Sequence, residues 1–211
     1  MKKNLFFGFL LCWVFIGTSQ EKWSLKKDTK GIQIYTRSVP NTTFNEYRAT
    51  TTLNTKINNV LMELLDAPEY FKGCVPGISY YLREKGKDQH VFYVRKNMPW
   101  PIKDRDIVIL LSVERIAEDK IKLSLESLPD GMAQKENTIR IKNLMGHWLL
   151  EENENKTRVT QQLFVDPEGS LPAFITNSLL VKGPLKTFVE LKESVKKYTP
   201  SYLKEQKSVG L

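Results

Sequence analysis

The spacing of apolar residues divides the chain into segments with different periods. Over residues 31–54, Ile32, Ile34 and Val39 alternate with polar residues, and a stretch rich in threonine and aromatic side chains follows. Over residues 57–65 the apolar spacing changes to three and four residues, which marks one face of a helix. The pattern therefore predicts two strands and then one short helix.

The middle of the chain, from Ser79 to Asp166, shows no helical period. Charged or turn-forming clusters, such as Pro129-Asp130-Gly131, separate its apolar stretches. They define six candidate strands: 78–86, 90–97, 105–117, 120–128, 138–150 and 157–166. Strands of this length fit a strongly curved antiparallel sheet better than a flat one.

The helical period returns over residues 172–198, where charged residues lie mostly away from the apolar stripe. Pro172 suits the first helical turn. Pro184 has no N–H for the carbonyl of Leu180, so we expect a kink or a break at Gly183-Pro184. One long amphipathic helix is the natural cover for the concave face of a curved sheet, and a cavity can remain between them.

The N-terminus has the order of a secretory signal. Lys2 and Lys3 precede an apolar run over residues 5–16, and small residues follow at 17–19. We predict cleavage after Ser19 and a periplasmic or secreted mature protein. An uncleaved N-terminal anchor is the alternative, although the run is short for a membrane span.

Composition narrows the classes of partner. The chain has 211 residues, of which 41% are hydrophobic and 27% charged, values typical of one globular domain. Two cysteines and two histidines argue against a zinc cluster or a disulfide scaffold, and we expect no metal and no cofactor. The net charge of +8 is dispersed, which disfavours nucleic acid but permits transient contact with an anionic membrane.

Two segments carry a resemblance to a known family. Residues 97–108 read NMPWPIKDRDIV, and residues 166–172 read DPEGSLP. Both resemble signature segments of START lipid-transfer domains, and Asn177 and Gly183-Pro184 fall where the last helix of that family carries an asparagine and a Gly-Pro. The matches occur in the family's order, and the predicted elements agree with its layout.

The resemblance implies an α+β helix-grip fold, in which a curved antiparallel sheet wraps around the C-terminal helix and encloses an apolar cavity. It assigns residues 20–198 to a lipid-binding domain, after the signal peptide at 1–19 and before a flexible tail at 199–211. Such domains carry sterols, phospholipids, ceramides or other hydrophobic ligands. The same superfamily includes cyclases, hydrolases and receptors, so the fold alone does not choose the function.

Several residues are candidates for ligand contact. Trp100 either anchors a rigid proline-flanked turn or lies at the pocket. Arg105 either joins an ion-pair cluster with its neighbouring aspartates or pairs with a ligand headgroup. Met145 and His147 share one face of a predicted strand, and Gln161 lies on the next strand; either polar side chain could bond a ligand hydroxyl or carbonyl. The resemblance adds residues in the first half of the last helix: Phe174, Ile175, Ser178 and Leu179.

The leading interpretation is a monomeric, noncatalytic carrier of a lipid or another hydrophobic molecule, with an internal cavity larger than roughly 300 Å³, near the lower end for ligand sites. The alternative is a cyclase- or hydrolase-type enzyme on the same fold. The sequence contains no G-x-S-x-G or H-E-x-x-H segment and suggests no catalytic residue beyond a possible carboxylate or His147 base.

Overall fold

The structure is a computed structural model, and it describes residues 22–65, 77–86, 88–169, 171 and 173–198. In chain order its elements are β1 (Ser24–Thr29), β2 (Ile32–Ser38), β3 (Asn45–Leu53), α1 (Ile57–Leu65), β4 (Gly77–Glu84), β5 (Gln89–Lys96), β6 (Asp104–Ala117), β7 (Lys120–Ser127), η1 (Pro129–Gly131), β8 (Thr138–Arg140), β9 (Asn143–Asn153), β10 (Lys156–Asp166), α3 (Ala173–Ser194) and η2 (Val195–Tyr198). The predicted signal peptide and C-terminal tail lie outside the described residues.

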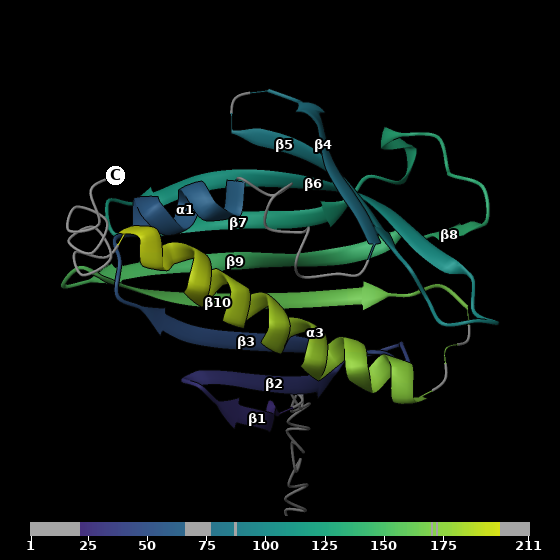
Figure 1. Ribbon diagram of the computed structural model, residues 1–211, viewed down its shortest axis with the longest axis horizontal. Helices are drawn as coiled ribbons and strands as arrows, with labels where there is room; N and C mark the ends of the chain where they lie inside the picture. The colour runs from purple at the N-terminus through teal and green to yellow at the C-terminus, as the bar shows by residue number, and fades with distance from the viewer. Residues whose placement is uncertain (1–21, 66–76, 87, 170, 172, 199–211) are drawn as a thin grey trace, which may run out of the picture.

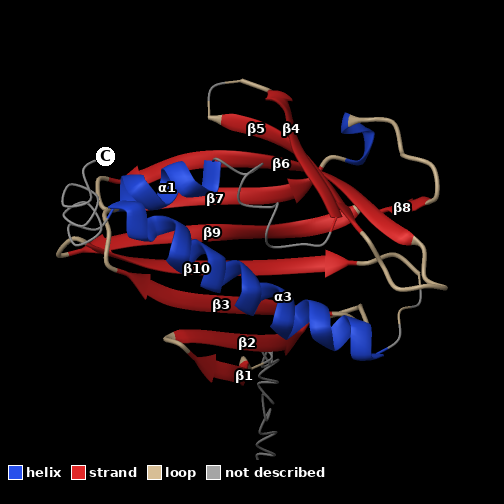
Figure 2. Ribbon diagram, in the orientation of Figure 1, coloured by secondary structure: helices blue, strands red, loops and turns tan. Residues whose placement is uncertain are grey.

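One curved sheet contains all of these strands. Its order is β1-β2-β3-β10-β9-β7-β6-β5-β4, with every neighbouring pair antiparallel, and the short β8 pairs in parallel with β6. Figure 1 shows α3 crossing one face of this sheet diagonally, and Figure 2 shows α1 in front of the same face. We call this the inner face of the sheet.

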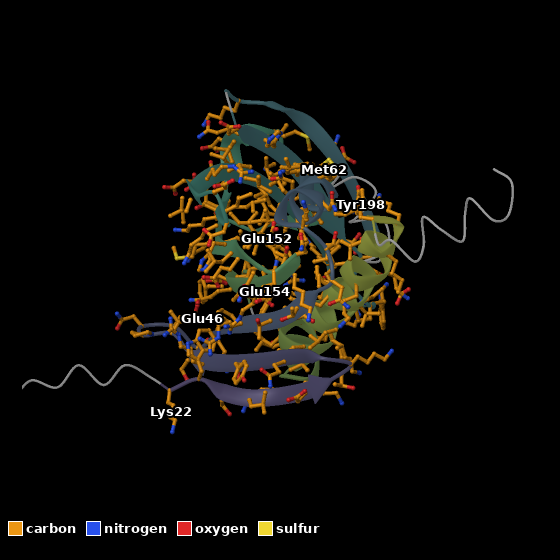
Figure 3. The ribbon with its side chains drawn as sticks, turned by 90° about the vertical axis from the view of Figure 1, so that its left-hand side faces the viewer. Lys22, Glu46, Met62, Glu152, Glu154 and Tyr198 are labelled. Carbon is orange, nitrogen blue, oxygen red and sulfur yellow. The ribbon has the colours of Figure 1, made fainter. Side chains whose placement is uncertain are left out.

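The second half of α3 and the short η2 that follows it anchor the helix to the inner face. Phe188 and Leu191 of α3 and Val195 of η2 are buried in the main core cluster with residues of β2, β3, β7, β9 and β10. Tyr198 of η2 donates a hydrogen bond of 3.0 Å to Glu63, so the end of this helical segment is also tied to α1. In Figure 3, Tyr198 and Met62 lie together on the helical side, whereas Glu46 lies on the other side of the sheet.

The β9–β10 hairpin fixes the alignment of two long neighbouring strands under α3. Its two turn residues, Glu154 and Asn155, have φ values of +50° and +63°, the left-handed conformation that two-residue hairpin turns require. Glu152, near this end of the hairpin, accepts a hydrogen bond of 2.8 Å from the backbone N–H of Ile57 and so caps α1. The hairpin thus sets its own register and holds the start of a helix.

The outer face is buried at one corner. The excursion between β7 and β9, which contains η1 and β8, covers a small apolar cluster formed by Val91, Tyr93, Val108, Leu110, Leu128 and Met132. The expected strand over 138–150 is therefore two elements, because β8 leaves the β9 line to pair with β6 over Asp104–Asp106.

Most of the predicted elements are present. The short helix over 57–65 has the expected bounds, and the C-terminal helix begins at Ala173. At Pro184 we expected a kink or a break; the break is absent, since α3 continues through that residue to Ser194. β1 was not predicted, because it is an exposed edge strand whose charged residues give no apolar alternation.

Candidate ligand-binding site

A hollow of about 240 Å³ lies between the inner face of the sheet and the middle of α3. Large apolar side chains from four strands form most of its wall: Val94, Ile107, Ile109, Leu144, Trp148, Leu163 and Val165. Within β6, β9 and β10 these positions differ by even numbers of residues, as the inward face of a pleated strand requires. The sheet therefore presents a continuous apolar surface to the hollow.

The helical side of the hollow combines one large side chain with several short ones. Leu179 lines it from the first half of α3, and the short residues Gly183, Pro184 and Thr187 line it further along the helix. The next residue, Phe188, stacks on Trp148 with ring centroids 5.5 Å apart and an interplanar angle of 23°. The stacked rings thus hold α3 away from the sheet at Phe188. The turn of α3 before Phe188 carries short side chains, and the hollow lies between that turn and the sheet.

A second hollow of about 60 Å³ adjoins the first. The two share five lining residues: Tyr47, Leu163, Val165, Pro167 and Leu179. Neither space alone reaches the expected size of roughly 300 Å³. The shared residues place the two spaces side by side.

One polar pair lies in the wall of the hollow. The Tyr47 hydroxyl of β3 donates a hydrogen bond of 2.8 Å to Oε1 of Gln161 on β10. Both side chains are buried, and both line the hollow. This bond leaves the Gln161 amide group as a donor near the apolar space.

Two cations lie at another part of the wall, where β5 ends and β6 begins. Lys96 and Arg105 are directly opposite each other in the β5–β6 register, and both line the hollow. The three nitrogens of the Arg105 guanidinium donate to the backbone carbonyls of Lys103, Glu168 and Pro167 at 2.6, 3.1 and 3.2 Å. Burial lowers the pKa of Lys96 and the pKa of Arg105 below their ordinary values.

The aspartates on either side of Arg105 pair with other arginines. Asp104 accepts from Arg95 at 2.7 Å, and Asp106 accepts from Arg140 at 2.9 and 3.0 Å. The ion-pair cluster expected around Arg105 is therefore not formed by Arg105 itself. Strand alternation explains this arrangement, because Arg105 points to the inner face whereas Asp104 and Asp106 do not.

The structure places three predicted site residues away from the hollow. Trp100 is 93% exposed in the loop between β5 and β6. Met145, which is 60% exposed, and His147 line a separate hollow on the outer face of β9. The expectation that Met145 or His147 faces the apolar cavity is corrected by the register, since it is Trp148 that points inward from this strand.

The helix residues that the resemblance suggested divide differently. Leu179 lines both hollows. Ile175 is buried but is not part of either wall. Phe174 and Ser178 belong to α3, and the placement of their side chains lies outside what the structure describes. Arg105 and Gln161 are the two other predicted residues that the fold brings to the hollow.

Sequence reasoning missed Lys96, Tyr47, Trp148 and Thr187. A signal was present for Lys96, because it follows Val94 at the two-residue spacing of an inward strand face. No comparable signal marked Thr187, because a short polar residue on an amphipathic helix does not indicate a cavity next to it.

The described residues offer little for other chemistry. They contain no group of three or more histidine, cysteine, aspartate or glutamate side chains placed to hold a metal ion. Among the same residues, no helix combines the length and the apolar character needed to cross a membrane.

A curved sheet closed by a long C-terminal helix over an apolar hollow defines the helix-grip class of proteins. The START domain family matches residues 16–201, and this chain belongs to that family.

Known proteins agree with this assignment. An uncharacterized protein of Pseudomonas aeruginosa is 31% identical over 183 residues, which cover 84% of this chain and 88% of that protein. A STAR-related lipid transfer protein of Xanthomonas axonopodis has a similar structure, with a TM-score of 0.74 and 28% identity over 82% of this chain and 98% of that one. Human STARD10 shares the fold, with a TM-score of 0.67 and 19% identity over 87% and 76% of the two chains.

Proposed function

We propose that the protein is a noncatalytic carrier that takes the apolar part of a lipid or other hydrophobic small molecule into the hollow beneath α3. The observation that carries this proposal is the hollow between an apolar wall of four strands and the segment of α3 with the short residues Gly183, Pro184 and Thr187. Membership of the START domain family supports it.

Burial of the ligand supplies the affinity. Each CH₂ group removed from water contributes about 0.8 kcal/mol, so an acyl or polyprenyl chain needs few polar contacts. Because the hollow is small, a long chain requires α3 or the side chains around Leu179 to move and join the two spaces. The short residues Gly183, Pro184 and Thr187 lie where such movement meets least packing.

Filling the hollow tests the proposal. Thr187→Phe places an aromatic ring in the space from α3, and Thr52→Phe places the same ring on an exposed position of β3. We expect displacement of a fluorescent fatty acid or phospholipid to show at least tenfold weaker binding for Thr187→Phe and unchanged binding for Thr52→Phe. Equal binding by a folded Thr187→Phe protein would overturn the proposal.

We also propose transient membrane contact through the loop of residues 97–103. Trp100, Pro99 and Pro101 are exposed there, and the adjacent Met98 lines the hollow. Exposed tryptophan favours the membrane–water interface, so the loop offers a docking point beside the entrance. Sedimentation with vesicles should fall for Trp100→Ala, whereas Trp23→Ala should leave it unchanged; equal sedimentation of both variants would argue against this contact.

Export and a monomeric state complete the proposal. The charged, apolar and small segments of residues 1–19 support cleavage after Ser19, and β1 begins downstream at Ser24. Intact-mass analysis of the exported protein should give an N-terminus at Gln20, and light scattering should give the mass of one chain. Retention of Met1 in the mature protein would exclude cleavage.

A further inference from the structure

Lys96 and Arg105 form an unusual feature for the wall of an apolar hollow. They are cross-strand neighbours on β5 and β6, and both side chains reach the same space. Side chains directly opposite in an antiparallel pair lie about 5 Å apart at their Cβ atoms. Two positive charges are therefore adjacent on a wall that is otherwise mostly apolar.

Neither charge is matched by a carboxylate among the described residues. Arg105 donates only to backbone carbonyls, and its guanidinium has five N–H groups, of which these bonds use three. Within the same part of the chain, Lys96 has no hydrogen bond or ion pair to another side chain. Burial lowers the pKa of both groups, as it does for cations that no described anion offsets.

The two aspartates next to Arg105 in sequence are already committed to other partners. Asp104 is paired with Arg95, and Asp106 with Arg140, on the side of β6 that faces away from the hollow. To reach Arg105, either carboxylate would have to break its ion pair with Arg95 or Arg140 and move to the other face of the sheet. The described residues thus supply no carboxylate partner for the charges at the hollow.

A buried cation without a counterion is costly, and the cost falls when an anion enters. Resting on the carrier function proposed above, we infer that the preferred ligand is an anionic amphiphile whose carboxylate or phosphate binds between Lys96 and Arg105, while its apolar tail lies along Ile107 and Ile109 toward α3. The guanidinium is held by its three carbonyl partners, so its free N–H groups are fixed in direction before the ligand arrives.

Three probes with the same sixteen-carbon tail test the inference: hexadecanoate, hexadecyl phosphate and hexadecanol. We expect one or both anions to displace a fluorescent apolar probe at least tenfold more tightly than the alcohol. A preference for hexadecanoate indicates a fatty-acid ligand, and a preference for hexadecyl phosphate indicates a phospholipid-type headgroup.

Lys96→Met is the informative variant, because Lys96 holds no other described side chain in place. It should lose the preference for the anions and keep its affinity for hexadecanol. Lys142→Met removes the same charge from an exposed position and should behave like the unaltered protein. Arg105→Met, with its fold checked by circular dichroism, should repeat the result for Lys96→Met.

The outcomes separate the two proposals. Equal affinity for all three probes, or a preserved anion preference in Lys96→Met, would overturn the anionic ligand and leave the apolar carrier standing. Failure of all three probes to bind would overturn both.

Discussion

Two arginines on neighbouring strands are buried to the same degree but are satisfied differently. Arg140 of β8 is 5% exposed and Arg105 of β6 is 6% exposed. Arg140 makes two hydrogen bonds to the Asp106 carboxylate and three to the carbonyls of Pro129, Met132 and Ala133. Arg105 has three carbonyl partners and no described carboxylate.

The difference follows the two faces of the sheet. Arg140 lies on the outer side, where it closes the excursion that covers Val108 and Leu110. Arg105 lies on the inner side, at the edge of the hollow. Burial of a cation therefore does not reveal its role; the presence or absence of a protein counterion does. Among the described residues, Arg140 has a carboxylate partner and Arg105 has only carbonyl partners.

The largest effect is expected from Asp106→Asn. This change leaves the Arg140 charge buried without its counterion, which costs about 3–5 kcal/mol in the free energy of unfolding. Urea denaturation measures the loss. Asp104→Asn is the matched control: its partner Arg95 is 27% exposed, so the loss should stay below about 1 kcal/mol. If Asp106→Asn and Asp104→Asn lose equal unfolding free energy, the buried Asp106–Arg140 pair is no more important for stability than the more exposed Asp104–Arg95 pair.

A smaller effect is expected from Arg105→Met. No buried carboxylate is left behind, and the three released carbonyls lie at the start of the loop toward α3 and beside Lys103, so the loss should be about 1 kcal/mol. Arg140→Met, in contrast, should cost about as much as Asp106→Asn. If urea denaturation gives Arg105→Met the larger loss, Arg105 is primarily a structural residue.

The smallest effect concerns how the stability of the protein changes at acidic pH. Burial would raise the pKa of Asp106, but the hydrogen bonds and charge of Arg140, with the Lys135 N–H and the Tyr93 hydroxyl, hold it below the ordinary value. A lowered pKa means that the stabilisation is present above the unfolded value of 3.8 and is lost as the pH falls through the folded value. Stability curves below about pH 4 should therefore be flatter for Asp106→Asn than for the unaltered protein. Parallel curves would show that the pair is not coupled to protonation.

Periodicity predicted the order of most elements because these strands and helices bury one face each. Periodicity failed for strands whose position depends on pairing with segments far away in the sequence. The β8 segment reads as part of β9 until its pairing with Asp104–Asp106 is seen. β1 has no apolar alternation because it lies exposed at the edge of the sheet and does not pack on the core.

The site was harder to predict, for a physical reason. The alternation along β9 separated His147 from Trp148 but did not say which face is inward. The hollow lies where α3 has the small side chains of Gly183 and Thr187. Small residues occur at many positions of a helix, so their presence in a single sequence does not predict a cavity. Lys96 was visible as an inward strand position, yet a lysine before a proline-rich loop looks like an ordinary strand end.

The Glu154-Asn155 turn has a consequence for how this fold can change. It places Trp148 opposite Gln161, and so sets which side chains of β9 and β10 meet the hollow. Insertion of one residue in this hairpin would exchange the two faces of a strand, sending Trp148 outward and His147 inward. The segment 133–137, between η1 and β8, pairs with no strand, although Ala133 and Lys135 bond to the Arg140–Asp106 pair. An inserted residue beside Glu136 would leave the strand register intact, so length variation among descendants of this chain should be more frequent there than at the tip of the hairpin, which keeps its two residues.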